Sequence, residues 1–140
     1  FKKWIMIREE MKVFVRNYSL QMYNEDYSIK CDLSYRNNIS VNGNREILKR
    51  LKNYLSDNNI FCDGLFVTEF GSSMSNLHNH ILMYCKNEKF YRIKSKIFVF
   101  WKNYGYCKID KYDSSKNYSE YVCKYMNVTN NRNWDFISNL

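Results

Sequence analysis

The sequence contains no proline, only two histidines, and no apolar stretch long enough to cross a membrane. Without proline the chain has no proline-made kinks or linkers, which fits one compact unit. A membrane-spanning helix needs roughly 20 apolar residues, and the opening FKKWIMIREEMKVFV is too charged for a signal-peptide core. We therefore expect a protein that does not engage a membrane.

The chain also lacks any closely spaced pair of cysteines. Its five cysteines are Cys31, Cys62, Cys85, Cys107 and Cys123, an odd number spread over most of the length. This spacing argues against a disulfide framework and against a CxxC zinc knuckle. Reduced thiols, and with them a cytoplasmic location, are the expectation.

Acidic residues are outnumbered, with 14 Asp and Glu against 22 Lys and Arg, and the formal net charge is +8. Such a balance favours an anionic partner, of which nucleic acid is the commonest. Aromatic residues are abundant, and within 88–108 they alternate with basic ones, as single-strand binding by ring stacking requires. The alternative is that most rings belong to the core and most lysines to a solvated face.

Hydrophobic periodicity predicts one α+β domain over the 140 residues, which could be a fragment of a longer chain because it opens on Phe. The predicted elements are strands at 27–35, 64–70, 77–85 and 106–110, and helices at 42–57, 88–103 and 116–127. Asn42 or Asn44 would cap the first helix and Ser114 or Ser115 the last, and Gly105 would follow the end of the second.

This order of elements predicts a ferredoxin-like, split βαβ fold: an antiparallel sheet with helices on one face, followed by a C-terminal helix that carries tyrosines. The N-terminal 1–22 is compatible with a helix or an extra strand. The Asn-rich segment 127–134 is expected to be a loop.

Both histidines fall in the predicted strand 77–85. Residues two apart in a strand share a face, so His78 and His80 should project together. If the preceding hairpin is centred between Ser73 and Met74, Glu69 lies directly opposite His78 on the same face. Two imidazoles and a carboxylate suit a divalent ion, Mn²⁺ or Mg²⁺, with Zn²⁺ less favoured. The competing interpretation is an exposed pair of histidines with no ligand.

Tyr121, Lys124 and Tyr125 share one face of the last predicted helix, with Tyr118 one turn earlier. A phenol beside an ammonium is a candidate nucleophile, because positive charge favours phenolate and can hold a phosphate. The alternative is that these tyrosines pack against the sheet.

Together these motifs resemble those of the HUH endonucleases. HNH within LHNHILMYC resembles their His-hydrophobic-His metal motif, YVCKYMNV resembles their Tyr-x-x-Lys motif, and VTEFGSSMSN is similar to the strand and loop that carry the third metal ligand. GYCKIDKYDSSKNYSEYVCKYM resembles the replication initiators of small single-stranded DNA phages, particularly gokushovirus-like microviruses. The resemblance runs from about residue 27 to 128. It departs from the pattern at Asn79, where an apolar residue is usual, and at Val128, where a second lysine is expected.

The resemblance implies the following site residues: His78, His80 and Glu69 as metal ligands, Tyr121 as nucleophile, Lys124 as its cationic neighbour, and Tyr125 as a second tyrosine for a second strand transfer. It implies a sequence-specific single-stranded DNA nickase and strand transferase that initiates rolling-circle replication through a 5′-phosphotyrosine. Lys124 and the metal would acidify the phenol. The implied partners are single-stranded DNA at a replication origin and host replication proteins, in the host cytoplasm if a phage encodes the chain.

Three alternatives remain open. One is an HUH transposase of a mobile element or a plasmid relaxase, although relaxases usually carry a third histidine that this chain lacks. Another is a non-catalytic basic module that binds nucleic acid. The third is a structural protein stabilised by a metal.

Overall fold

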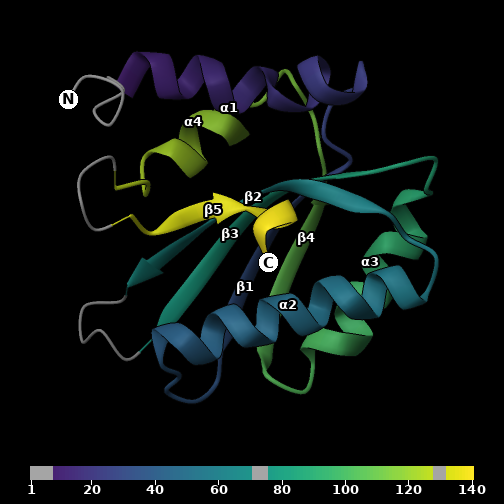
Figure 1. Cartoon of the computed structure of the whole chain (residues 1–140), viewed down its shortest axis with the longest axis vertical. Helices are drawn as coiled ribbons and strands as arrows, with labels where there is room; N and C mark the ends of the chain where they lie inside the picture. Colours follow the sequence, from purple (N-terminus) through teal and green to yellow (C-terminus); the bar gives the residue numbers. More distant parts are fainter. Residues whose placement is uncertain (1–7, 71–75, 128–131) are drawn as a thin grey trace.

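A five-stranded antiparallel sheet, in the order β4-β1-β3-β2-β5, forms the centre of the molecule (Figure 1). The structure is a computed structural model that describes residues 8–70, 76–127 and 132–140. Its elements are α1 (Arg8–Tyr23), β1 (Ile29–Tyr35), α2 (Val41–Asp57), β2 (Cys62–Phe70), β3 (Leu77–Cys85), α3 (Phe90–Trp101), β4 (Gly105–Lys111), α4 (Tyr118–Cys123), β5 (Trp134–Phe136) and a 3₁₀ turn, η2 (Ile137–Asn139).

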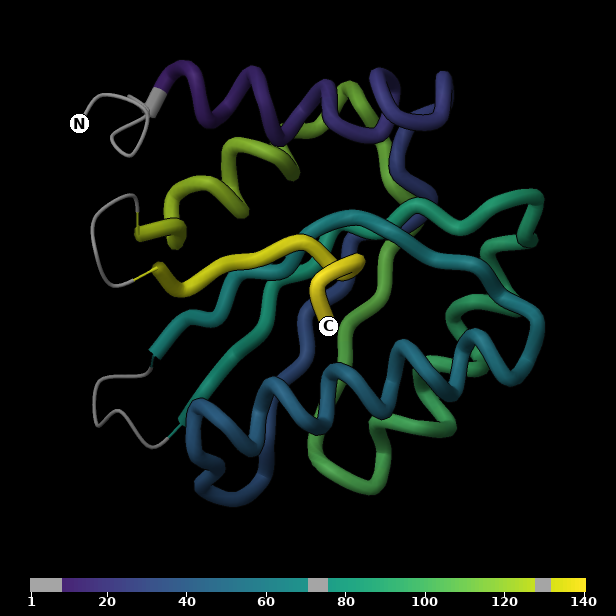
Figure 2. Tube along the Cα trace, viewed as in Figure 1, coloured from purple at the N-terminus to yellow at the C-terminus, as the bar shows by residue number. Residues whose placement is uncertain are grey.

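The predicted α+β, split βαβ architecture is confirmed. Helices α2 and α3 cover one face of the sheet, and α4 lies on the opposite face together with α1 (Figures 1 and 2). The N-terminal segment, which was compatible with a helix or a strand, is helical over Arg8–Tyr23. The sheet is therefore enclosed between two helical layers, and the tyrosine-bearing helix belongs to the layer that α1 completes.

Each face of the sheet has its own apolar core. On the α2 and α3 side, the predicted stripe of α2 is buried against β1, and the Trp101 ring is fully buried with its Nε1–H donating to the Ser34 carbonyl (3.0 Å). On the other side, Met11 and Val15 of α1 pack with Val122 of α4 against β2 and β3. Burying a large apolar side chain contributes about 1.5–3 kcal/mol, so α1 and α4 are held to the sheet mainly by this second core.

Several predicted details were wrong. Ser40, rather than Asn42 or Asn44, caps α2, because its hydroxyl accepts the Gly43 N–H (2.9 Å). Helix α4 begins at Tyr118, so neither Ser114 nor Ser115 caps it; the Ser115 hydroxyl instead donates to Asp113. The helix also ends at Cys123, earlier than expected, which leaves Lys124 at its C-cap and Tyr125 beyond it.

Gly105 has a different role from the predicted helix terminator. Helix α3 ends at Trp101, and Gly105 is the first residue of β4. A Cβ at this position would lie 1.9 Å from the Ser34 carbonyl oxygen. The glycine is needed because β4 approaches β1 this closely.

The segment 127–134 was predicted to be a loop, but Trp134 begins β5, which pairs with β2. Val128 lies outside the described residues, as do Ser73 and Met74 at the assumed hairpin centre. None of the five cysteines, all of which are described, forms a disulfide. Within the described ranges, no helix is both long and apolar enough to span a membrane.

A buried polar network ties α2 to the sheet on the side away from the histidine side chains. Asn79 is fully buried and accepts a hydrogen bond from the Thr68 hydroxyl (2.8 Å), and Asn44 and Asn79 bond to each other through both amides. The Tyr35 hydroxyl donates to Asn44 (2.5 Å). The amide in the middle of the HNH motif is thus fully paired, which explains how a polar residue is accommodated where an apolar one is usual.

Replacing Asn79 should destabilise the fold. Asn79→Leu removes the partner of Thr68 and Asn44 and leaves both buried without it, so we expect a loss of roughly 1–3 kcal/mol in the free energy of unfolding. Urea denaturation followed by circular dichroism measures this loss. Asn38→Leu, at an exposed position, is the matched control, and equal midpoints for the two variants would show that the network does not stabilise the protein.

Candidate active site

The pairing of β2 with β3 places the predicted ligands together. Glu69 is opposite His78 and Val67 is opposite His80, as the assumed hairpin centre requires. Directly opposed residues share a face, so Glu69, His78 and His80 lie on the side of the sheet that carries α4. The predicted register is confirmed.

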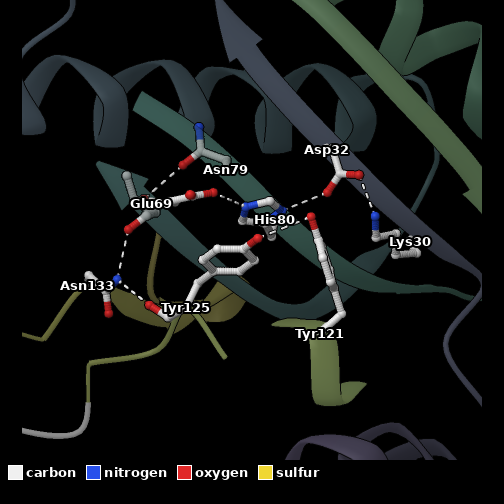
Figure 3. A network of polar contacts seen from close by, with 9 residues as sticks. Lys30, Asp32, Glu69, Asn79, His80, Tyr121, Tyr125 and Asn133 are labelled. Carbon is white, nitrogen blue, oxygen red and sulfur yellow. Dashed lines mark hydrogen bonds and ion pairs between the residues drawn. The ribbon is translucent and has the colours of Figure 1, made fainter. Parts of the chain in front are cut away.

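His80 is the centre of a hydrogen-bonded cluster (Figure 3). Its side chain is 6% exposed, its Nδ1 lies 2.8 Å from Asp32 Oδ1, and its Nε2 lies 2.8 Å from Glu69 Oε1. The two carboxylates come from opposite sides, because β3 runs between β1 and β2 and Asp32 is paired with His80. The imidazole is therefore fixed in orientation by both neighbouring strands.

The two carboxylates also set the protonation of the ring. Burial by itself lowers the pKa of His80, but the hydrogen bonds and negative charges of Asp32 and Glu69 outweigh it and raise the pKa above its ordinary value. Burial by itself raises the pKa of Asp32, whereas its bonds with His80 and Lys30 lower it overall. The cluster thus favours an imidazolium between two carboxylates.

A buried lysine completes this cluster. Lys30, on β1, is 6% exposed and forms an ion pair with Asp32. Its Nζ lies 4.9 Å from the centroid of the Tyr121 ring. Sequence reasoning missed Lys30 and Asp32, although the alternation of IKCDLSY places both on the face opposite the apolar Ile29, Cys31 and Leu33. Two charged residues on the second face of a central strand were the available signal.

The tyrosines meet His80 from α4 and the residues after it. The Tyr125 ring stacks on the imidazole, with centroids 4.5 Å apart and an interplanar angle of 8°, and the Tyr121 ring stands edge-on to it at 5.6 Å. The two hydroxyl oxygens are 3.3 Å apart and hydrogen-bonded. Lys124 Nζ lies 5.2 Å and 5.3 Å from the centroids of the two rings. The structure therefore brings Tyr121, Lys124 and Tyr125 to the histidine cluster.

Asn133 holds this arrangement to the sheet and was also missed. Its side-chain amide donates to the Tyr125 carbonyl and to the Thr68 carbonyl, both at 2.8 Å. One side chain just before β5 thereby connects the end of the tyrosine segment to β2 (Figure 3). Because this residue lies in the segment predicted to be a loop, only its position beside β5 reveals the role.

The phenol of Tyr121 is not acidified by its protein neighbours. Its hydrogen bond with Tyr125, its burial, and the negative charges of Tyr125, Asp32 and Glu69 raise the pKa of Tyr121 to about 12. The ammonium of Lys124 alone therefore does not produce the expected acidification. Deprotonation at neutral pH requires that the neighbouring carboxylate charge be neutralised.

The donor types fit a divalent ion, although their side chains are bonded to one another. His78 is exposed on the same face as His80 and Glu69, and Asp32 supports the far nitrogen of His80 as carboxylates do behind metal-bound histidines. Glu69 contacts His80 Nε2 directly. Within the described part of the chain, no group of three or more His, Cys, Asp or Glu side chains is arranged around a common ion position.

An open cleft of about 540 Å³ leads to Tyr121 from the side of α1. Its lining residues are Lys12, Asn117, Glu120, Tyr121 and Lys124. Two ammonium groups thus stand at an opening wide enough for an anionic substrate beside the phenol.

Fold and site together define an antiparallel α+β domain in which a buried His-carboxylate cluster meets a pair of tyrosines. Residues 28–130 match the model of a family described as replication-associated proteins of the ORF2 type. Since this match covers most of the chain, the protein belongs to that family, and all six predicted site residues lie within the matched region. No curated protein sequence and no solved structure matches the chain. Family membership supports a role in the initiation of DNA replication.

Removing the Asp32 carboxylate should be costly, because it leaves the buried Lys30 ammonium without its partner. Asp32→Leu should lower the free energy of unfolding by roughly 3 kcal/mol, and adding Lys30→Met should restore most of the loss. Chemical denaturation of the single and double variants tests this expectation. Glu9→Ala, which breaks the exposed pair with Lys12, should change stability little; a double variant no more stable than Asp32→Leu would contradict the pairing.

The raised pKa of His80 should appear as a pH dependence of the metal-free protein. The ring binds a proton more tightly in the folded state, so its contribution to stability is complete below the unfolded pKa of about 6.5 and is lost as pH rises through the folded pKa. NMR titration of the His80 ring in EDTA should show a midpoint above about 6.5. Asp32→Asn should lower that midpoint, and an unchanged midpoint would mean that Asp32 does not stabilise the imidazolium.

Proposed function

We propose that the protein is a metal-dependent HUH-type endonuclease that nicks single-stranded DNA at a replication origin and becomes joined to it through Tyr121, as in rolling-circle replication. The observation that carries the proposal is the contact of the Tyr121 and Tyr125 phenols with His80, in a member of a replication-associated family. A nucleophile and a predicted ligand that are far apart in sequence meet at one point.

His78, His80 and Glu69 are the residues that would hold the ion, Mn²⁺ or Mg²⁺. Asp32 would keep the proton on His80 Nδ1, so that Nε2 is the nitrogen available to a metal. A bound ion would polarise a non-bridging oxygen of the scissile phosphate. Because Glu69 now contacts Nε2, binding has to replace that hydrogen bond and displace a proton from the imidazolium.

The same replacement changes the acidity of the nucleophile. Asp32 and Glu69 are among the groups that raise the pKa of Tyr121. A divalent charge beside them offsets their repulsion of phenolate, so the phenol becomes easier to deprotonate. The resting cluster therefore keeps Tyr121 protonated and unreactive until the carboxylates are neutralised.

In the reaction, the Tyr121 oxygen forms a bond to phosphorus as the bond from phosphorus to the 3′ oxygen breaks. The phenolic proton is lost to solvent, and the departing 3′ oxygen takes up a proton to give a 3′-hydroxyl that can prime synthesis. The phosphodiester energy is conserved in the phosphotyrosine. Lys124, beside both rings, is placed to neutralise phosphate charge.

Tyr125 is suited to a second transfer by position. Its hydroxyl is hydrogen-bonded to that of Tyr121, so both phenols reach the same region of the site. A second attack by Tyr125 on the next scissile phosphate would release or rejoin the first strand. The alternative role is structural, because the Tyr125 ring also covers His80.

A non-catalytic nucleic-acid-binding module is the second candidate. One observation favours it: both nitrogens of His80 are already hydrogen-bonded to carboxylates. In that case His78→Ala would leave every DNA-dependent property unchanged, whereas a nickase would lose cleavage and largely keep binding.

The proposal predicts a covalent adduct. Mixing the protein with single-stranded DNA from the element that encodes it, in Mn²⁺, should give a band of lower mobility on a denaturing gel, and peptide mapping should place the DNA on Tyr121. EDTA, His78→Ala and Tyr121→Phe should each abolish the band, because they remove the ion, a ligand and the nucleophile.

Tyr91→Phe is the control for the loss of one hydroxyl, since Tyr91 is exposed on α3 across the sheet. An adduct that persists in Tyr121→Phe but disappears in Tyr125→Phe would reassign the nucleophile. No adduct under any of these conditions would remove the nickase and leave the binding module.

A further inference from the structure

Pairing across the sheet arranges the side chains of the site face in rows. The outer row runs from Tyr106 on β4 through Ser34 and His78 to Glu69 on β2. The next row holds Lys108, Asp32, His80 and Val67, and the third holds Asp110, Lys30, Leu82 and Leu65. Members of a row share the face on which the tyrosines lie, because directly opposed residues point to the same side.

Helices α1 and α4 cover these rows unequally. Leu65, Leu82 and Lys30 of the third row are buried beneath the helices, and His80 of the second row is buried as well. In the outer row, by contrast, His78 is exposed and Tyr106 is 69% exposed. The outer row is therefore an open strip of sheet that leads away from the candidate ligands toward the β4 edge.

Tyr106 is an aromatic side chain presented to solvent beside the site. In the part of the chain that the structure describes, its ring contacts no other ring and its hydroxyl has no hydrogen-bond partner. Two strand spacings of about 4.8 Å separate it from His78, so the ring stands roughly 10 Å from the candidate ion position along the row. A flat exposed ring at this distance suits the stacking of an unpaired base.

The charge near Tyr106 suits a phosphate. Lys108 follows Tyr106 on the same face of β4, is exposed, and forms no ion pair within the described ranges. Asp32, directly opposite Lys108, is bonded to Lys30 and His80, and Glu69 is bonded to His80. Lys108 is thus available, and Asp110 in the third row confines the basic part of β4 to its outer end.

We propose that this open strip binds the single-stranded DNA next to the scissile phosphate, with a base stacked on Tyr106 and a phosphate on Lys108. The strand crosses β1 on its way from Tyr106 to the histidines. This inference rests on the proposed function, which it extends from the reacting groups to the substrate path. A second copy of the chain on the same strip is the competing occupant.

Fluorescence anisotropy with a labelled oligothymidine, in the Tyr121→Phe background so that no cleavage occurs, measures the binding. Tyr106→Ala should weaken it roughly ten-fold, because stacking on a ring depends little on the base, and Tyr106→Phe should retain it. Lys108→Gln should reduce the slope of log affinity against log salt by about 0.7.

Matched controls lie on the other face of the sheet: Tyr91→Ala on α3, where the ring is 79% exposed, and Lys49→Gln on α2. If Tyr106→Ala binds as tightly as Tyr91→Ala, the strip is not the binding path, even where the Tyr121 adduct forms. If no adduct forms but binding depends on Tyr106, the nickase fails and the strip stands. A change of sedimentation mass in Tyr106→Ala without DNA would assign the strip to self-association and overturn the inference.

Discussion

The hydrogen bonds between His80 and the carboxylates of Asp32 and Glu69 depend on three strands at once. Each carboxylate comes from a strand that flanks β3, so a shift of one residue in either pairing would turn a partner to the other face. The stacked Tyr125 and the edge-on Tyr121 rest on the ring that these bonds orient. Register, histidine orientation and tyrosine placement are thus a single constraint, which explains why so few ionisable groups suffice to build the site.

How much of this was predictable depends on the range of each interaction. Strand alternation and a symmetric hairpin are local, and they placed Glu69 and His78 together correctly. Helical spacing likewise grouped Tyr121 with Lys124. The pairing of β1 with β3 joins segments about 50 residues apart, and no spacing in the sequence encodes it, so Asp32 and Lys30 could be seen only as charged residues of unknown partner. Strand β5 has three residues, too few for a periodic pattern, and with it Asn133 was missed.

Strand β3 serves two layers with alternate residues. Its histidines face the tyrosines, while Asn79 between them faces α2 and bonds to Asn44 and Thr68. An amide network has directional requirements that an apolar contact lacks, so it fixes α2 against the sheet at the level of the histidines. The departure from the family pattern at Asn79 is therefore matched by polar partners in two other elements.

Helix α4 has six residues, too few to be stable alone, and it depends on the apolar contact with α1. Yet α1 ends at Tyr23, before the first residue of the family match at 28. A chain trimmed to the matched region would keep every candidate ligand and both tyrosines while losing the cover that holds them in place. Domain boundaries drawn from sequence similarity and from the mechanical support of the nucleophile do not coincide in this protein.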